Sequence, residues 1–316
     1  MGGKIRLGVS ACLLGQPVRW NGGHKRDRYL TETLGQYVEW VPVCPEVECG
    51  LPTPREPLRL VGDPSQPRLV TSLTGEDKTD QMLNWAKKRV CELESEGLHG
   101  FIFKAKSPSG GLERVKVYSN KGIPSKRGVG VFASVFIEHF PLLPVEEEGR
   151  LHDMKIRENF IERVFTLKRW RDTVERGKRR GDLMEFHTSH KLLILSHSPE
   201  HQRKMGAIVA GAKEYSTEHL FDDYERLLMD ALRLKSTTRN NANVLQHVLG
   251  YFKKALSADE KQEALEIVDL YRQERVPLIV PITLINHYVR KYDQGYLKQQ
   301  YYLHPHPLEL QLRNHV

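Results

Sequence analysis

The four cysteines of this 316-residue chain all lie in its first 91 residues, at Cys12, Cys44, Cys49 and Cys91. This clustering favours a metal site or a reactive thiol over a disulfide framework. Cys91 lies beside the apolar stripe of a predicted helix, so it is expected to be a packing or neutral residue. The other three cysteines are soft sulfur donors, and no fourth cysteine accompanies them. Three such ligands indicate an iron–sulfur cluster with one open iron or a zinc ion with one open position. Small cysteines that only pack are the alternative.

Two oxygen-bearing residues lie close to these cysteines or on a neighbouring loop. Glu46 follows Cys44 by two residues and is a candidate general base that could activate water. An ion pair with Arg55 is the alternative role for Glu46. Ser107, in the segment Ser-Pro-Ser-Gly-Gly, is expected to hydrogen-bond a substrate or water, although the same segment is typical of a turn.

Hydrophobic patterning predicts the elements that position these residues. Apolar runs at 5–9, 37–43 and 100–104 predict buried strands, and apolar residues at helical spacing over 77–96 predict a helix. Strands alternating with a helix predict an α/β fold with a Rossmann-like parallel sheet. Because ligands bind beyond the carboxyl ends of parallel strands, the candidate residues are expected at one edge of this sheet.

The second half of the chain has a different pattern. It predicts a mainly helical region whose last long helix begins at the capping sequence Ser-Ala-Asp-Glu. We therefore expect an α/β domain at 1–167, a basic linker at 168–180 and an all-α domain at 181–316. The predicted helices of this domain are 187–196, 220–234, 241–256 and 259–275.

The net charge of +8 is unevenly distributed. Residues 181–316 hold 17 basic and 17 acidic side chains, so the whole excess lies before them, and it is densest at 168–180. A basic run of this kind suits a phosphate backbone, although a solvated helix face is the simpler alternative. The side chains expected to bind phosphate or substrate are Asn21, Arg26, Ser109, Lys178, Arg179 and Arg180.

Other features exclude several classes of protein. The longest apolar runs are broken by prolines and are much shorter than the roughly 20 residues of a membrane span. The first residues show no apolar leader, which predicts a cytoplasmic protein. The chain has no Gly-x-Gly-x-x-Gly motif for a dinucleotide.

Several longer motifs, in order, resemble the thiouracil desulfidase family. The C-terminal half of the chain resembles the helical domain that is fused to the desulfidase domain in a two-domain subgroup of this family. The motifs that carry this second resemblance are His-Val-Leu-Gly-Tyr-Phe-Lys at 247–253 and Pro-Leu-Ile-Val-Pro at 277–281. The motifs of the N-terminal half are Val-Ser-Ala-Cys-Leu-Leu-Gly at 9–15, Val-Arg-Trp-Asn-Gly-Gly at 18–23, Val-Cys-Pro-Glu at 43–46, Gly-Leu-Pro-Thr-Pro-Arg at 50–55 and Lys-Ser-Pro-Ser at 106–109.

This resemblance implies an enzyme with a 4Fe-4S cluster that is held by three cysteines, with the fourth iron free for the sulfur of a thiocarbonyl base. The two-domain subgroup implies tRNA as the partner and conversion of 4-thiouridine to uridine, with release of sulfide and no net redox change. Glu46 and Ser107 would be the catalytic residues. A desulfidase of free thiouracil-type bases and a non-catalytic RNA-binding protein with a cluster or zinc are the alternatives.

The chain departs from the family pattern at one position. The family's stand-alone members carry a cysteine in Ser-Pro-Ser-Cys-Gly, where this chain has Gly110. Cys49 lies five residues after Cys44 and is the expected replacement. The expected cluster ligands are therefore Cys12, Cys44 and Cys49.

Overall fold

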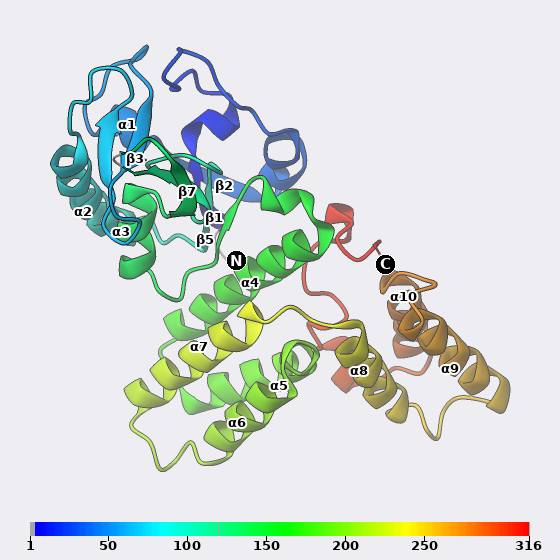
Figure 1. Ribbon diagram of the computed structural model, residues 1–316. Helices are drawn as coiled ribbons and strands as arrows, with labels where there is room; N and C mark the ends of the chain where they lie inside the picture. Colours follow the sequence, from blue (N-terminus) through cyan, green and yellow to red (C-terminus); the bar gives the residue numbers. More distant parts are fainter. Residues whose placement is uncertain (1–3, 120, 316) are drawn as a thin grey trace. The chain divides into compact units, whose positions relative to one another are not determined.

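The computed structural model describes residues 4–119 and 121–315 (Figure 1). The chain folds into two compact units that divide between His152 and Asp153. The first unit contains β-sheets with helices, and the second contains helices. This confirms the predicted combination of an α/β region with a helical region.

A four-stranded parallel sheet, here called sheet A, is the centre of the first unit. Its strand order is β2-β1-β5-β8, with Leu7 paired to Trp40 on one side and to Gly100 on the other. The three predicted strands are all present, which confirms the parallel sheet. The bounds are β1 Ile5–Ser10, β2 Val38–Val43, β5 Gly100–Phe103 and β8 Val145–Glu147.

Helices α2 (Thr79–Ser95) and α3 (Val131–His139) pack against each other in this unit. The predicted stripe of α2 is buried, and aromatic rings of α3 contact those of β5, with Phe101 and Phe136 centroids 4.7 Å apart. This apolar cluster fixes β5 and the loop that follows it. The short helical segments are Ala11–Leu14, Tyr29–Thr33, Leu34–Gln36, α1 (Pro45–Glu48) and Arg150–His152.

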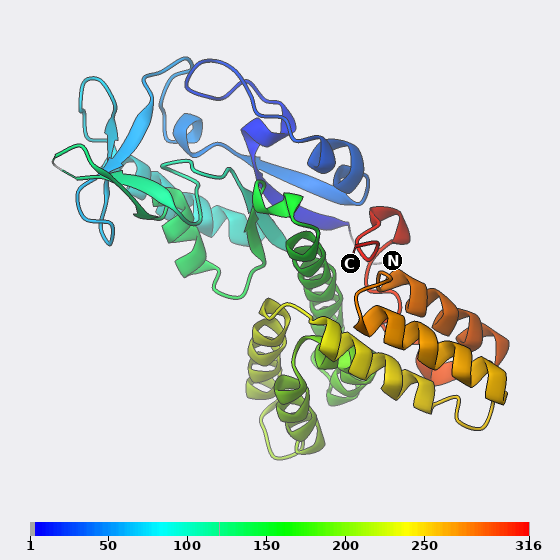
Figure 2. The ribbon, with the colours of Figure 1, turned by 45° about the vertical axis from the view of Figure 1, so that its right-hand side comes forward.

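A second small sheet with strand order β4-β3-β6-β7 was not predicted. Strands β3 and β6 are parallel, and the two outer pairs are antiparallel. Figure 2 shows these strands at one end of the first unit. The bounds are β3 Leu58–Val61, β4 Arg68–Thr71, β6 Val115–Tyr118 and β7 Pro124–Gly128.

The regular secondary structure of the second unit consists of helices in its described residues. Trp170 is fully buried and stacks on Tyr224 at 5.0 Å between centroids, and Ser257 begins α9 with the predicted capping box. In Figure 1, α4 lies along α7 and α5 lies along α6. The helices are α4 Met154–Glu175, α5 Arg180–His197, α6 Pro199–Ala210, α7 Thr217–Arg233, α8 Thr238–Gly250, α9 Ala258–Arg272, α10 Ile279–Lys291, α11 Gly295–Lys298 and the short turn Leu308–Leu310.

The structure does not form a linker over 168–180. Helix α4 begins at Met154 and continues to Glu175, so most of the basic run is the end of a helix inside the second unit. Arg169 in this run packs inward, since its guanidinium lies 4.1 Å from the centre of the Tyr301 ring. The prediction of a linker was therefore wrong up to Glu175. Basic residues that pack inside the unit made this part of α4 look like an exposed segment in the sequence.

The described helices contain none that is long and apolar enough to span a membrane.

Candidate active site

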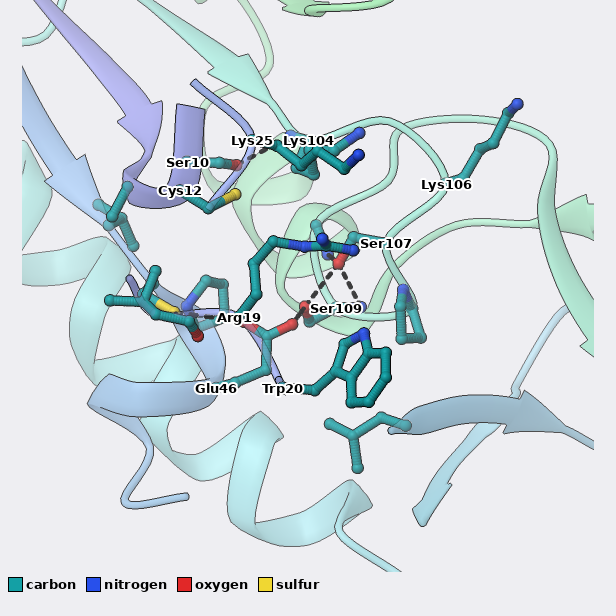
Figure 3. Close-up of a pocket in the computed structure, with 18 of the residues that line it drawn as sticks. Ser10, Cys12, Arg19, Trp20, Lys25, Glu46, Lys104, Lys106, Ser107 and Ser109 are labelled. Atoms are coloured by element: carbon teal, nitrogen blue, oxygen red, sulfur yellow. Dashed lines mark hydrogen bonds between the residues drawn. The ribbon is translucent and has the colours of Figure 1, made fainter. Parts of the chain in front are cut away.

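A cavity of about 400 Å³ opens at the carboxyl edge of sheet A (Figure 3). Most of its wall comes from the loops that follow β1, β2 and β5. The carboxyl ends of parallel strands share one edge, which is where such sheets bind ligands. The structure brings Cys12, Cys44 and Ser107 together around this cavity.

Two cysteines face the cavity from rigid positions. Cys12 lies in a 3-10 turn directly after β1, and Cys44 is the N-cap residue of α1 directly after β2. Both are buried and all four cysteines of the chain are free thiols. Burial, together with the charge of Glu46, raises the pKa of Cys12 to about 11 and the pKa of Cys44 to about 12. Coordination through these thiols therefore requires a cation that binds strongly enough to displace their protons.

Cys49 lies at the other end of α1. It is the C-cap residue, and its Sγ lies 3.3 Å from the carbonyl oxygen of Glu46. It is absent from the cavity wall that Cys12 and Cys44 line. The structure therefore places only two of the three expected ligands at the cavity.

Gly110, which replaces the family cysteine, is itself part of the cavity wall. A Cβ atom added at this glycine would have its nearest neighbours 3.8 and 3.9 Å away, which is ordinary van der Waals contact. A Cβ atom at position 110 would thus fit without displacing its neighbours.

The thiols are not arranged as the ligands of a single ion. Tetrahedral zinc with thiolates at about 2.3 Å holds its sulfur atoms roughly 3.8 Å apart. In residues 4–119 and 121–315, Cys12, Cys44 and Cys49 do not form a group whose ligand atoms lie within 4.8 Å of one another. A mononuclear zinc site would therefore require the loops to move.

Glu46 is the centre of a hydrogen-bonded chain of side chains at the cavity. Its Oε1 accepts a hydrogen bond from Ser109 Oγ, and the Ser109 and Ser107 hydroxyl oxygens are 2.9 Å apart. Its Oε2 lies 3.5 Å from Cys44 Sγ and 3.8 Å from Arg55 Nη2. The contact with Arg55 that was considered as an alternative is thus present together with the serine pair. A carboxylate beside two hydroxyls can receive a proton and pass it along the chain.

The rest of the cavity wall is cationic and partly aromatic. Glu46 is the carboxylate among the described lining residues, and Lys104 is neutralised by an ion pair with Glu148. The indole ring of Trp20 is 45% exposed, which is unusual for so large an apolar side chain. The cations in the wall are Arg19, Lys25, Arg55, Lys104 and Lys106.

Two of the expected substrate-binding residues lie outside this wall. Asn21 holds a local turn through its side-chain oxygen, and Arg26 forms an exposed ion pair with Glu32 at 3.2 Å. Neither lines the cavity, whereas their neighbours Arg19 and Lys25 do. The loop at 19–26 therefore reaches the cavity through Arg19 and Lys25 and not through the expected Asn21 and Arg26.

The other expected cations, at 178–180, belong to the second unit. Arg179 Nε lies 2.7 Å from Asp182 Oδ2, and Arg180 donates a hydrogen bond of 2.9 Å to the carbonyl oxygen of Tyr215. Both side chains are exposed, and Lys178 is half-buried. Lys178 and Arg179 connect α4 to α5, and Arg180 is the first residue of α5; the three residues are here called the basic turn.

The residues that hold α1 in place were not identified from the sequence. Glu48 accepts a hydrogen bond of 2.7 Å from the backbone N–H of Cys44, and its other oxygen lies 3.0 Å from Arg89 Nε on α2. Gln81, also on α2, donates a hydrogen bond of 2.9 Å to the carbonyl oxygen of Cys49. The proline that follows Cys44 is a helix-start signal that could have revealed this turn.

The part of the chain that contains this cavity matches a known family. The family model described as 2-thiouracil desulfurase matches residues 7–148, which include the whole cavity wall. The chain belongs to the 2-thiouracil desulfurase family. A second family model, described as a protein of unknown function (DUF1722), matches residues 191–307.

Two curated proteins and one solved structure are similar to parts of this desulfurase-family chain. The uncharacterized protein YbgA of Escherichia coli K12 is 31% identical over 153 residues, which are 48% of this chain and 90% of that protein. The uncharacterized protein YbbK of Bacillus subtilis 168 is 31% identical over 108 residues, which are 33% of this chain and 71% of that protein. A solved structure of the [4Fe-4S]-dependent thiouracil desulfidase TudS is 32% identical, covers 48% of this chain and 95% of its own, and has a TM-score of 0.39.

Proposed function

We propose that this protein is a 4Fe-4S-dependent desulfidase that converts the thiocarbonyl group of a thiolated pyrimidine to a carbonyl group, and that its substrate is 4-thiouridine in tRNA. The observation that carries the proposal is the arrangement of two buried thiols and the Glu46–Ser109–Ser107 chain around one cavity. Family membership of residues 7–148 supports the same reaction class.

The donor set fits an iron–sulfur cluster. Buried thiols are soft ligands that suit such clusters, and Cys12 and Cys44 are placed by the backbone ends of two adjacent strands. In this proposal Cys12, Cys44 and Cys49 hold the cluster. When bound, the cluster supplies a Lewis-acidic iron for the sulfur of the substrate.

The chain's own residues would supply the proton chemistry. The overall reaction consumes one water and releases hydrogen sulfide, so a proton must leave the attacking water and protons must reach the sulfur. In this proposal Glu46 accepts the first proton, and Arg55 Nη2 lies 3.8 Å from its carboxylate. Ser109 and Ser107 would hold the base and return the proton through their hydroxyl groups.

Two observations favour a nucleotide over a free base. The cavity wall carries Arg19, Lys25 and Lys106, which exceed what a neutral pyrimidine requires but suit phosphate groups. The exposed Trp20 ring offers a flat face on which an unpaired base can stack. The helical unit, with its basic turn at 178–180, would bind the body of the tRNA.

The proposal is tested by supplying both substrate types to the reconstituted full-length protein under anaerobic conditions. Loss of the thiocarbonyl absorbance of bulk tRNA is expected, with slower loss from a free thiopyrimidine. Turnover of the free base alone would favour the salvage alternative. No turnover of either, in a protein that retains its cluster, would favour a non-catalytic binding protein.

Neutralising the basic turn tests the role of the helical unit. The combined change Lys178→Gln, Arg179→Gln and Arg180→Gln is expected to weaken tRNA binding and to reduce its log–log salt slope, by up to roughly 0.9 for each duplex phosphate that the protein no longer neutralises. Turnover of a free thiopyrimidine should be unchanged. The measurement is a tRNA binding titration at several salt concentrations.

A matched control removes the same charge elsewhere in the unit. Arg203, Lys204 and Lys213 are exposed cations, and replacing them with glutamine should leave the salt slope near that of the wild type. Equal effects of the two triple changes would show that the basic turn at 178–180 has no special role.

The third cluster ligand can be tested through the position that the family uses. Cys49→Ser is expected to lower the iron content, and adding Gly110→Cys to that variant is expected to restore it, because Gly110 lines the cavity and a Cβ atom fits there. Iron content and the visible absorbance of the reconstituted proteins measure both steps. A Cys49→Ser protein with a full cluster would remove Cys49 from the ligand set.

A further inference from the structure

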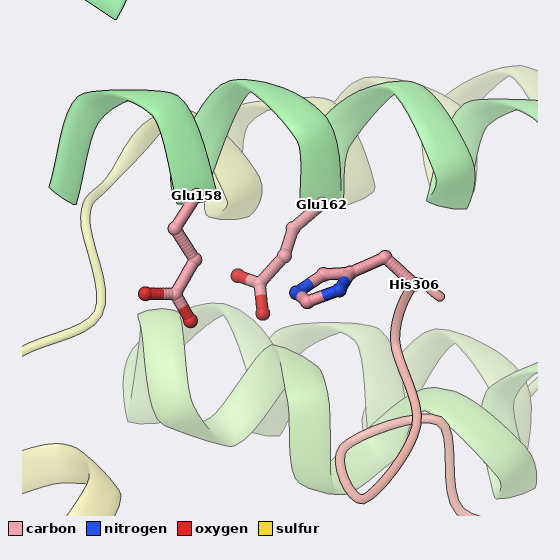
Figure 4. Close-up of side chains that lie close together, drawn as sticks. All are labelled: Glu158, Glu162 and His306. Atoms are coloured by element: carbon pink, nitrogen blue, oxygen red, sulfur yellow. The ribbon is translucent and has the colours of Figure 1, made fainter. Parts of the chain in front are cut away.

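The second unit contains a buried cluster of carboxylates and histidines that is independent of the proposed active site. Glu158 and Glu162 lie one turn apart on the same face of α4, and His306 approaches them from the C-terminal segment (Figure 4). One ligand atom from each of the three residues lies within 4.8 Å of the others. All three residues are at most 9% exposed. Carboxylates this deeply buried require compensating positive charge.

Arg313 provides part of that compensation. Its Nη2 lies 2.8 Å from Glu162 Oε1, and its Nε lies 3.2 Å from Glu158 Oε1. One guanidinium thus faces both carboxyl groups. Burial, together with the charge of Glu162, nevertheless raises the pKa of Glu158. The remaining oxygens lie near imidazole nitrogens, with His197 Nε2 at 3.1 Å from Glu162 and His315 Nε2 at 3.4 Å from Glu158.

The imidazole of His306 points one nitrogen into this cluster. Its Nδ1 lies 3.2 Å from the carbonyl oxygen of Pro307, which can only accept, so Nδ1 carries the proton of the neutral ring. Burial and the charge of Arg313 lower the pKa of His306 to about 4, so the ring stays neutral at pH 7. The buried Nε2 has no hydrogen-bond partner among the described residues. Its lone pair therefore faces the carboxylate oxygens of α4 without a donor between them (Figure 4).

We propose that Glu158, Glu162 and His306 bind a divalent transition-metal ion that joins the C-terminal segment to α4. An ion at this position would accept the lone pair of His306 and the oxygen donors of the two carboxyl groups. A histidine whose Nδ1–H donates to a backbone carbonyl while Nε2 faces outward has the tautomer that metal-binding histidines use. Two oxygen donors with one nitrogen donor suit Zn²⁺, Mn²⁺, Fe²⁺ or Co²⁺.

The geometry requires only small adjustments of these side chains. Neighbouring ligand atoms at about 2.0–2.2 Å from one ion are roughly 3.0–3.6 Å apart. The three ligand atoms lie within 4.8 Å of one another, so the side chains would have to move closer together. Arg313 can keep its hydrogen bonds, because each carboxylate has about four lone-pair positions. Glu158 lines one cavity of this unit and His306 lines another.

Ion binding is tested on the full-length protein with its N-terminal cluster loaded, so that the cysteines do not compete. Mn²⁺ uptake is followed by the electron paramagnetic resonance signal of the free ion, and Zn²⁺ uptake by competition with a coloured chelator. We expect one ion per chain and a melting temperature that increases with ion concentration. His306→Gln and Glu158→Gln should each weaken binding at least tenfold.

The control is His304→Gln, which changes an exposed histidine of the same segment. It should bind the ion as the wild type does. Melting curves without added ion show whether each variant is folded, and Glu158→Gln retains an oxygen that can accept from Arg313. Uptake of neither ion, or uptake that His306→Gln leaves unchanged, would overturn the proposal and leave a buried water as the partner of His306. Because this cluster lies in the second unit, desulfidation by the N-terminal site stands or falls separately.

Discussion

Cys12→Ser and Cys44→Ser proteins are expected to lose the iron–sulfur cluster and all desulfidation. Each thiol is buried, lines the cavity and follows directly from a strand of sheet A, so each is held at the proposed cluster site by the backbone of its strand. The wild-type protein should hold about four irons per chain after anaerobic reconstitution, with a broad charge-transfer absorbance. Both signals should be absent from the two variants.

Cys91→Ser is the matched control for this prediction. Cys91 is exposed on α2, its thiol contacts only the carbonyl oxygen of Lys87 among the described hydrogen bonds, and it is outside the cavity wall. Its replacement should leave iron content and turnover unchanged. A Cys12→Ser protein with normal iron content would contradict the proposed cluster site.

Glu46→Gln is expected to keep the cluster but to lower the rate of desulfidation by about 10²- to 10⁴-fold, the usual effect of removing a positioned acid–base group. An amide has nearly the same shape and can still accept the hydrogen bond from Ser109 Oγ, so the serine pair stays in place. It cannot accept a proton from water. The measurement is the rate of thiocarbonyl loss at matched iron content.

Glu39→Gln serves as the comparison for Glu46. Glu39 is an exposed carboxylate on β2, the strand that leads to the same loop, and its contact is an ion pair with Arg6 at 3.6 Å. This variant should have wild-type activity. If Glu46→Gln were equally active, Glu46 would have no role in proton transfer.

The sequence predicted the part of the site that follows from strand patterning. Short apolar runs before Cys12, Cys44 and Ser107 predicted strand ends at one sheet edge, and the structure places these residues around one cavity. Cys49 could not be placed in the same way. Its orientation depends on the single turn of α1, and one residue in a helical turn changes the direction of a side chain by about 100°.

The rest of the fold depends on contacts that sequence periodicity does not report. Strands β3 and β6 are four residues long and pair in parallel across more than 50 residues of chain, so neither has a recognisable pattern alone. The beginning of α4 was assigned to the wrong domain for a related reason. Its inward face includes Glu158, Glu162 and Arg169, whose partners are distant in the sequence. Because these positions are charged, the helix lacks the continuous apolar stripe by which a buried helix face is predicted.

The attachment of α1 to α2 has a consequence for variation outside the cavity. Arg89 pairs with Glu48, whose carboxylate accepts a hydrogen bond from the backbone N–H of Cys44, and Gln81 donates to the carbonyl oxygen of Cys49. Neither Arg89 nor Gln81 lines the cavity. Substitutions at these two positions should therefore impair the active site remotely while the protein stays folded. A search for function-altering variants that considers only cavity-lining residues would overlook them. Helix α2 thus supports the turn that carries Cys44 and Glu46. Residues of α2 that contact this turn are restricted in the substitutions they tolerate, although they lie outside the cavity.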